Sequence, residues 1–194
     1  MRKDRNKRKT KLILPLFIIG LMVLSVFGVM IGGISSGEKP IEYNDVVFNP
    51  TNEGYSFSSN GFSYLIVNSP LEIEGFFTDF SNELWSDVYA RRFSKIYLDI
   101  SNQNTIAAAN EIYQNLKGKE DVFVSCSEDH KEDVHCLDLP IKSCIGEEGV
   151  LIINFEVTEE KENSYESGCL NLRGSLGYLI GASDVFILKY AGVF

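Results

Sequence analysis

The sequence predicts an N-terminal transmembrane helix followed by one α/β (α+β) domain. Three observations lead to this fold class. Residues 12–34 form an apolar run without a charge, residues 41–68 carry β-hairpin signals, and residues 95–124 have the pattern of a strand, a helix and a second strand. The rest of the chain adds further strands and a C-terminal helix.

The apolar run at residues 12–34, LILPLFIIGLMVLSVFGVMIGGI, is long enough to cross a membrane. At ~1.5 Å per residue it spans about 35 Å, against a hydrocarbon core of ~30 Å. Residues 1–11 carry seven basic residues and one acidic residue, a net charge of +6. Because positive flanks stay in the cytoplasm, we expect a basic cytoplasmic tail at 1–11 and an extracytoplasmic domain at 41–194. Residues 35–40 form a short polar linker between membrane and domain.

A cleaved signal peptide is the alternative interpretation of the N-terminal segment. Residues 32–37 include small side chains that suit a cleavage site. Signal peptides, however, have apolar regions of only ~7 to 15 residues, so the longer run favours an uncleaved anchor.

The composition of the remaining chain limits its partners. Beyond the basic tail the sequence has 11 basic and 26 acidic residues, a net charge of −15. This charge argues against nucleic acid and against anionic lipid head groups as partners of the outer domain. We expect a single domain tied to the membrane by its N-terminal helix, with another membrane or envelope protein as its partner and no cofactor.

The four cysteines all lie on the predicted outer side of the membrane. An even number of cysteines in an oxidising compartment indicates two disulfide bonds, with three possible pairings. The sequence alone does not choose among the pairings. The one we favour joins Cys126 to Cys136, closing a hydrophilic loop, and Cys144 to Cys169, closing a longer one.

The first part of the domain has the pattern of a three-strand meander. Strands are expected at residues 43–48, 55–58 and 62–68, with turn chemistry at residues 49–52. Asn60-Gly61 between the last two strands is a strong hairpin signal. After this meander, residues 79–89 predict a helix with Leu84 and Val88 on one face and Trp85 in or beside the core.

The clearest unit follows at residues 95–124. A β-branched and aromatic run at 95–100 precedes a helical stripe that begins at Ile106, with Asn102 or Asn104 as the cap and Gly118 after its end. A second strand at 121–124 completes a βαβ unit, which predicts two parallel strands with a right-handed crossover.

The last third of the chain supplies the remaining elements. After the polar loop between Cys126 and Cys136, residues 149–157 read as a buried strand because they are continuously apolar. Residues 158–168 are expected to be a charged connection, residues 169–173 a short strand, and residues 175–190 a helix with one apolar face.

Several short motifs follow one another in a fixed order along the chain. They are Tyr43-Asn44, Asn60-Gly61, Tyr97-Leu98-Asp99, the cysteine pair at 126 and 136 with the segment 139–144, and Gly168-Cys169-Leu170. With the basic tail and single apolar span, the chain resembles uncharacterised small single-pass archaeal membrane proteins that have a Cys-containing extracytoplasmic α/β domain. The group has no assigned activity, so the resemblance implies only the topology and the disulfide bonds.

Candidate ligand-binding residues lie where parallel strands end, because α/β sheets bind ligands at that edge. Asp99 and Asn102 follow one strand, and Arg173 ends another. His130 and His135 are weak candidates for metal ligands among the acidic residues of the loop. Their spacing matches no zinc pattern, and we expect a solvated loop closed by a disulfide.

No catalytic motif is present: the sequence has no phosphate-binding glycine loop, GxSxG, HExxH or CxxC pattern. We therefore expect a noncatalytic, membrane-tethered outer domain that binds a partner or ligand as an accessory protein. The alternative is an anchored envelope enzyme with its site near Asp99 and Arg173.

Overall fold

The structure is a computed structural model that describes residues 39–90, 92–144 and 147–193. Residues 39–194 form one compact unit. The predicted tail at 1–11, the membrane helix at 12–34 and most of the linker at 35–40 lie outside the described residues. Within the described ranges, no helix is both long enough and apolar enough to cross a membrane.

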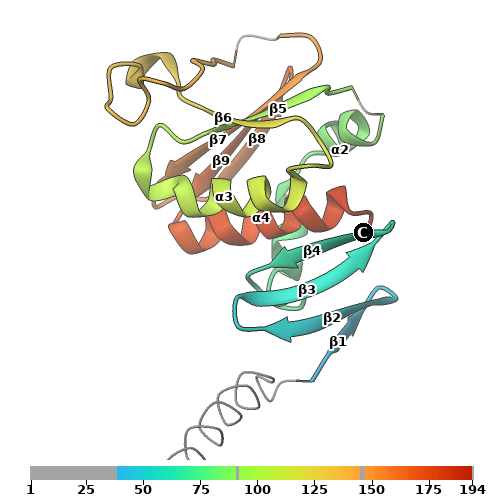
Figure 1. Ribbon diagram of the computed structural model, residues 1–194. Helices are drawn as coiled ribbons and strands as arrows, with labels where there is room; N and C mark the ends of the chain where they lie inside the picture. Colours follow the sequence, from blue (N-terminus) through green and yellow to red (C-terminus); the bar gives the residue numbers. More distant parts are fainter. Residues whose placement is uncertain (1–38, 91, 145–146, 194) are drawn as a thin grey trace, which may run out of the picture. The chain divides into compact units, whose positions relative to one another are not determined.

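The first sheet of the domain is antiparallel, with the strand order β1-β2-β3-β4 (Figure 1). Its strands are β1 (Ile41–Tyr43), β2 (Val46–Thr51), β3 (Gly54–Ser59) and β4 (Phe62–Ile66). The predicted number of three strands is wrong, because the expected strand at 43–48 contains a turn. Asn44 and Asp45 have φ angles of 48° and 62°, the left-handed values that a two-residue hairpin turn requires.

The predicted turn at residues 49–52 is also wrong, because β2 continues through Thr51. Pro50 lies opposite Tyr55 of β3, whereas β1 pairs only with residues 46–48 of β2. This half of β2 therefore has a free edge, where a proline costs no hydrogen bond of the sheet. The Asn60-Gly61 hairpin between β3 and β4 is confirmed.

The second sheet is mixed, with the order β6-β5-β7-β9-β8. Its strands are β5 (Lys95–Asp99), β6 (Val122–Ser125), β7 (Val150–Val157), β8 (Glu162–Glu166) and β9 (Cys169–Gly174). The predicted βαβ unit is confirmed: β5 and β6 are parallel and are joined by η2 (Gln103–Thr105) and α3 (Ile106–Leu116). The expected connection at 158–168 contains β8, an antiparallel edge strand whose exposed and polar residues gave no apolar signal.

Helices fill the space between the two sheets (Figure 1). α4 (Leu176–Tyr190) crosses the middle of the domain, and α3 lies beside it, while η1 (Glu74–Asp79) and α2 (Asn82–Tyr89) connect the sheets. The single apolar face predicted for α4 is wrong. Its residues are buried on almost every side, and even Asp184 is 0% exposed, because both sheets pack against it. Trp85 of α2 is buried, as predicted.

Polar side chains from α3 and α4 form hydrogen bonds with the main chain of the edge strand β4 and of the two residues that follow it. Asn115 accepts from the Leu65 N–H at 2.8 Å and donates to the Leu65 carbonyl at 2.7 Å. Asp184 accepts from the main-chain N–H groups of Val67 at 3.1 Å and Asn68 at 2.9 Å. The helices thereby hold the first sheet on the second through specific bonds as well as apolar packing.

Both expected disulfide bonds are present. Cys126 is joined to Cys136 and Cys144 to Cys169, with Cα separations of 5.8 Å and 5.4 Å. The first bond closes the loop of residues 126–136, called the disulfide loop below, which contains η3 (Glu128–His130). The second bond ties the segment before β7 to the start of β9.

Candidate functional site

A hollow of about 860 Å³ opens at the carboxyl ends of the parallel strands β5, β7 and β9. In the sheet, β6 lies on one side of β5, and β7, which comes later in the chain, lies on the other side. The ends of β5 and β7 therefore form the switch point at which α/β sheets bind ligands. Side chains from segments 99–103, 127–135, 154–156 and 171–173 line this space, which we call the polar hollow.

Asp99 anchors one wall of the polar hollow through a chain of hydroxyl groups. Its Oδ1 accepts from the main-chain N–H of Ser101 at 2.8 Å and from the Ser101 hydroxyl. The Ser101 oxygen accepts from the Ser127 N–H at 2.7 Å and lies 3.0 Å from the Ser127 hydroxyl. Because the Ser101 hydrogen goes to Asp99, the Ser127 hydroxyl is the donor in that pair. These bonds tie the end of β5 to the disulfide loop, and no described residue hydrogen-bonds to Asp99 Oδ2.

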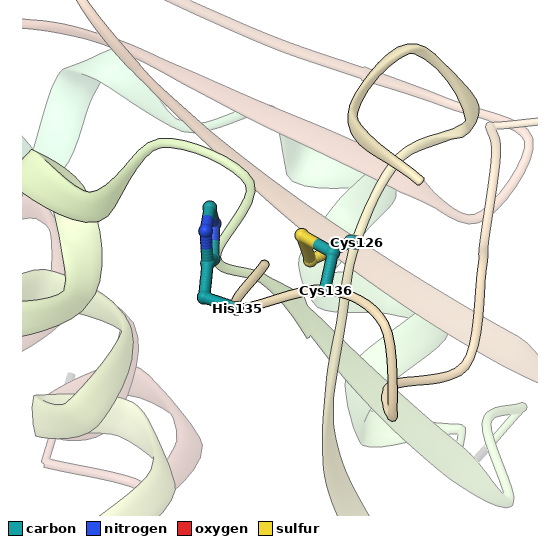
Figure 2. A group of neighbouring side chains, drawn as sticks. All are labelled: Cys126, His135 and Cys136. Atoms are coloured by element: carbon teal, nitrogen blue, oxygen red, sulfur yellow. A yellow bond between two sulfur atoms is a disulfide. The ribbon is translucent and has the colours of Figure 1, made fainter. Parts of the chain in front are cut away.

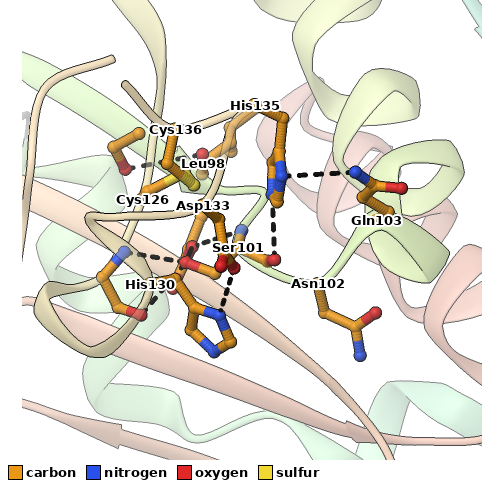
Figure 3. The surroundings of a disulfide bond; sticks show 12 residues. Leu98, Ser101, Asn102, Gln103, Cys126, His130, Asp133, His135 and Cys136 are labelled. Carbon is orange, nitrogen blue, oxygen red and sulfur yellow. Dashed lines mark hydrogen bonds and ion pairs between the residues drawn. A yellow bond between two sulfur atoms is a disulfide. The ribbon is translucent and has the colours of Figure 1, made fainter. Parts of the chain in front are cut away.

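His135 is held at the rim with both ring nitrogens occupied. Figure 3 shows the ring between Ser101 and Gln103, with Nε2 3.0 Å from the Ser101 carbonyl and Nδ1 3.2 Å from the Gln103 amide nitrogen. A carbonyl oxygen only accepts and an amide nitrogen only donates. In this arrangement Nε2 donates to the Ser101 carbonyl and Nδ1 accepts from Gln103, so His135 acts as a spacer between the loop and the segment after β5.

His135 also lies beside the disulfide bond between Cys126 and Cys136 (Figure 2). The possible metal-ligand atoms of these three residues lie within 4.8 Å of one another, which is close enough for them to share a metal ion. Both sulfurs are in the disulfide bond, and the two cysteines are only 0% and 1% exposed. Since neither His135 nitrogen has a free lone pair, the arrangement fits a disulfide packed beside a histidine. We assign no metal to it.

His130 lines the polar hollow from η3 and is oriented by an acidic neighbour. Its Nδ1 lies 2.8 Å from Asp133 Oδ2, and both side chains are about half exposed. No described serine hydroxyl hydrogen-bonds to either histidine. The bond between His135 and Ser101 goes to the main-chain oxygen of the serine and not to its hydroxyl. The nucleophile and base pair that a hydrolase of the serine type needs is therefore not formed by the residues described here.

The floor of the polar hollow is the face of the mixed sheet that points away from the helices. Two rows of polar side chains cross strands β7, β9 and β8 there. In the first row Asn154 donates to Asn171 at 2.9 Å, and Asn171 donates to Ser164 at 3.3 Å. In the second row Arg173 donates to Glu156 at 2.6 Å and to Glu162 at 3.4 Å, so its charge is matched by two carboxylates.

The polar hollow is rich in acidic groups. Its lining includes four carboxylates, from Asp99, Asp129, Asp133 and Glu156. The one arginine, Arg173, is already held by Glu156 and by Glu162 outside the lining. The space is therefore suited to a positively charged ligand that can also donate hydrogen bonds to amide and hydroxyl oxygens.

The five residues singled out from the sequence all lie around this one space: Asp99, Asn102, His130, His135 and Arg173. Asn102 also caps η2, since its side chain accepts from the Asn104 N–H at 3.0 Å. The sequence argument missed Asn154, Glu156 and Asn171. Their signal was available, because polar residues alternating with apolar ones inside a buried strand mark a second face that is not packed on helices.

Protein-family models, curated proteins and solved structures were all compared with the chain, and none of them matches it.

Proposed function

We propose that this chain is a membrane-tethered extracytoplasmic domain that binds a small, positively charged, hydrogen-bonding ligand in the polar hollow without chemically changing it. The observation that carries the proposal is the charge of the lining: Glu156 and Glu162 already neutralise the single arginine, Arg173, and the lining still carries the carboxylates of Asp99, Asp129 and Asp133. A cation entering this space gains attraction from Asp99 and Asp129, which form no ion pair with a described residue, and from Asp133 beside His130.

The proposed location rests on two further features. Disulfide bonds persist in oxidising compartments outside the cytosol, and both pairs of cysteines are bonded. The apolar run at 12–34 is long enough to anchor the chain in a membrane. Because the basic tail favours a cytoplasmic N-terminus, this anchor would put the cysteines outside the cytosol.

The proposed role is that of an accessory protein to a membrane or envelope partner. The disulfide loop supports this role because it holds the apolar side chain of Val134 in solvent at the rim of the hollow, and another apolar residue, Leu137, directly follows the loop. Val134 is 87% exposed and Leu137 is 64% exposed, which offers a partner apolar contacts beside the ligand.

Calorimetric titration with three small molecules of similar length tests the charge preference. Putrescine carries two positive charges, butanediol none and succinate two negative charges. We expect putrescine to bind most tightly, with an affinity that falls as salt is added because screening weakens partly exposed charge pairs. Binding of succinate as tight as that of putrescine would contradict the proposal.

Substitutions at the rim locate the binding. Replacing both Asp129 and Asp133 by Asn should weaken putrescine binding about tenfold, a loss of ~1.4 kcal/mol. Glu128→Gln combined with Glu132→Gln is the matched control, because it also removes two charges from the same loop and neither residue lines the polar hollow. Equal losses in the double variant and the control would show that putrescine responds only to the general acidity of the domain.

A further inference from the structure

A second cavity lies between the two sheets and shares no lining residue with the polar hollow. Two adjoining spaces of about 270 Å³ each have Phe62, Tyr64, Val88, Glu120 and Tyr190 in common. We call the joined space the aromatic cavity. Its floor is apolar: Ile96, Leu151 and Phe186 are 6%, 0% and 0% exposed.

Lys119 places a cation in this cavity. Gly118, with a φ of 80°, allows the tight turn after α3 from which Lys119 projects. Its ammonium donates to the carbonyls of Ser63 at 3.0 Å and Asn115 at 2.5 Å and lies 3.7 Å from the centre of the Tyr64 ring. An ammonium group has three N–H donors, so one remains without a partner among the described residues. Burial lowers the pKa of Lys119.

Glu120, the next residue, places an anion in the same cavity. Its Oε1 accepts from the Tyr190 hydroxyl at 2.5 Å. No described residue forms an ion pair with Glu120 or with Lys119, so the two opposite charges line one cavity without neutralising each other through contact.

Tyr64 adds a polar group that lacks a partner. Its side chain is 5% exposed and lines the cavity, yet no described residue hydrogen-bonds to its hydroxyl. Burial raises the pKa of Tyr64, with a smaller effect in the same direction from Glu120. The hydroxyl itself is not among the buried polar atoms of the described residues that lack a partner, so it meets the open space of the cavity, where a ligand donor or acceptor can reach it.

We propose that the aromatic cavity binds a small zwitterion with an apolar side chain, the chemical class of free hydrophobic amino acids. Lys119 takes the carboxylate through its remaining N–H, Glu120 takes the ammonium, and the apolar floor takes the side chain. A ligand with one charge alone would leave either Lys119 or Glu120 without a counter-charge in a largely apolar space, which is unfavourable. This site is separate from the one in the proposed function.

A ligand series on the unaltered full chain tests the proposal by calorimetry. L-phenylalanine carries both charges, hydrocinnamate lacks the ammonium, and phenethylamine lacks the carboxylate. We expect L-phenylalanine to bind at least about tenfold more tightly than either analogue, since a hydrogen bond to a charged group contributes ~1.5 to 3 kcal/mol. Equal affinities for the three compounds, or no binding of L-phenylalanine at millimolar concentration, would overturn it.

Matched substitutions assign the binding to this cavity. Glu120→Gln retains an oxygen that accepts from Tyr190 and should lower the affinity for L-phenylalanine about tenfold, whereas Asp121→Asn, at the exposed next position, should not. In a second pair, Lys119→Gln should also lower the affinity for L-phenylalanine about tenfold, whereas Lys117→Gln, at an exposed position, should not. An unchanged affinity in Glu120→Gln overturns the proposal, and if Lys119→Gln does not fold, the Glu120 pair and the ligand series decide. None of these residues lines the polar hollow, so failure here leaves the proposed function standing.

Discussion

At the scale of single residues, two acidic side chains on the central helices make the domain sensitive to pH. Burial raises the pKa of Glu111 to about 7, with smaller contributions in the same direction from Asp184 and Glu53. Burial also raises the pKa of Asp184 to about 6, although its hydrogen bonds from Asn68 and Val67 oppose this. Both groups bind a proton more tightly in the folded state than in the unfolded state. The free energy of unfolding therefore falls as pH rises through the range between their ordinary and raised pKa values.

Glu111→Gln removes the larger of these two effects. For Glu111 the range runs from its ordinary value of 4.5 to about 7, and the cost of the buried charge is fully present above that range. We expect the variant to be more stable than the unaltered protein at pH 8, by about 1 kcal/mol after allowing for solvent screening of this partly exposed group. The gain should vanish below pH 4.5, as measured by urea denaturation across the range.

The exposed Glu160→Gln serves as the control for that measurement and should change stability equally little at both ends of the pH range. A constant difference between Glu111→Gln and the unaltered protein at all pH values would contradict the assignment of the effect to titration of Glu111.

At the scale of elements, the strand β4 depends on side chains of the helices for its edge hydrogen bonds. Asn115 makes both bonds to the main chain of Leu65 and is 5% exposed. Asn115→Ala leaves a donor and an acceptor of β4 unsatisfied, so we expect a loss of ~2 to 3 kcal/mol in the free energy of unfolding. Chemical denaturation measures the loss, and amide hydrogen exchange should show faster exchange at Leu65.

Gln114→Ala is the matched control, since Gln114 is exposed and bonds only to Asn110 one turn earlier on α3. A similar loss of stability in both variants would contradict the assignment of the loss to the bonds with β4, because alanine has a higher helix propensity than either residue that it replaces.

The sequence predicted the elements whose apolar pattern is strong and missed those whose pattern is polar. The βαβ unit and β7 were readable because their buried residues recur at the period of a helix or run continuously in a strand. β8 was missed because its residues are exposed at the sheet edge. The turn at Asn44-Asp45 lacks the glycine that marked the hairpin at Asn60-Gly61, so β1 and β2 were read as one strand.

At the scale of the whole molecule, the candidate site could be predicted in part. The rule that ligands bind beyond the carboxyl ends of parallel strands selected Asp99, Asn102 and Arg173, and all three line the polar hollow. The sequence did not indicate that Arg173 would be neutralised by Glu156 and Glu162. Ion pairs across strands depend on register, and the strand β8 that supplies Glu162 was itself missed.

The proposed membrane anchoring and orientation are testable with a single added thiol. All four cysteines are in disulfides, so the unaltered protein should not react with a membrane-impermeant maleimide. Val134→Cys adds a thiol at a position that is 87% exposed and should react on intact cells. Reaction only after the cells are lysed would place the domain on the cytoplasmic side.

The most direct test of the central claim is a nuclear magnetic resonance titration of residues 39–194 with putrescine. We predict that the amide signals that shift come from the segments lining the polar hollow, at 99–103, 127–135, 154–156 and 171–173. Shifts spread over the acidic surface of the domain, with none concentrated in these segments, would contradict the claim that the hollow is a binding site.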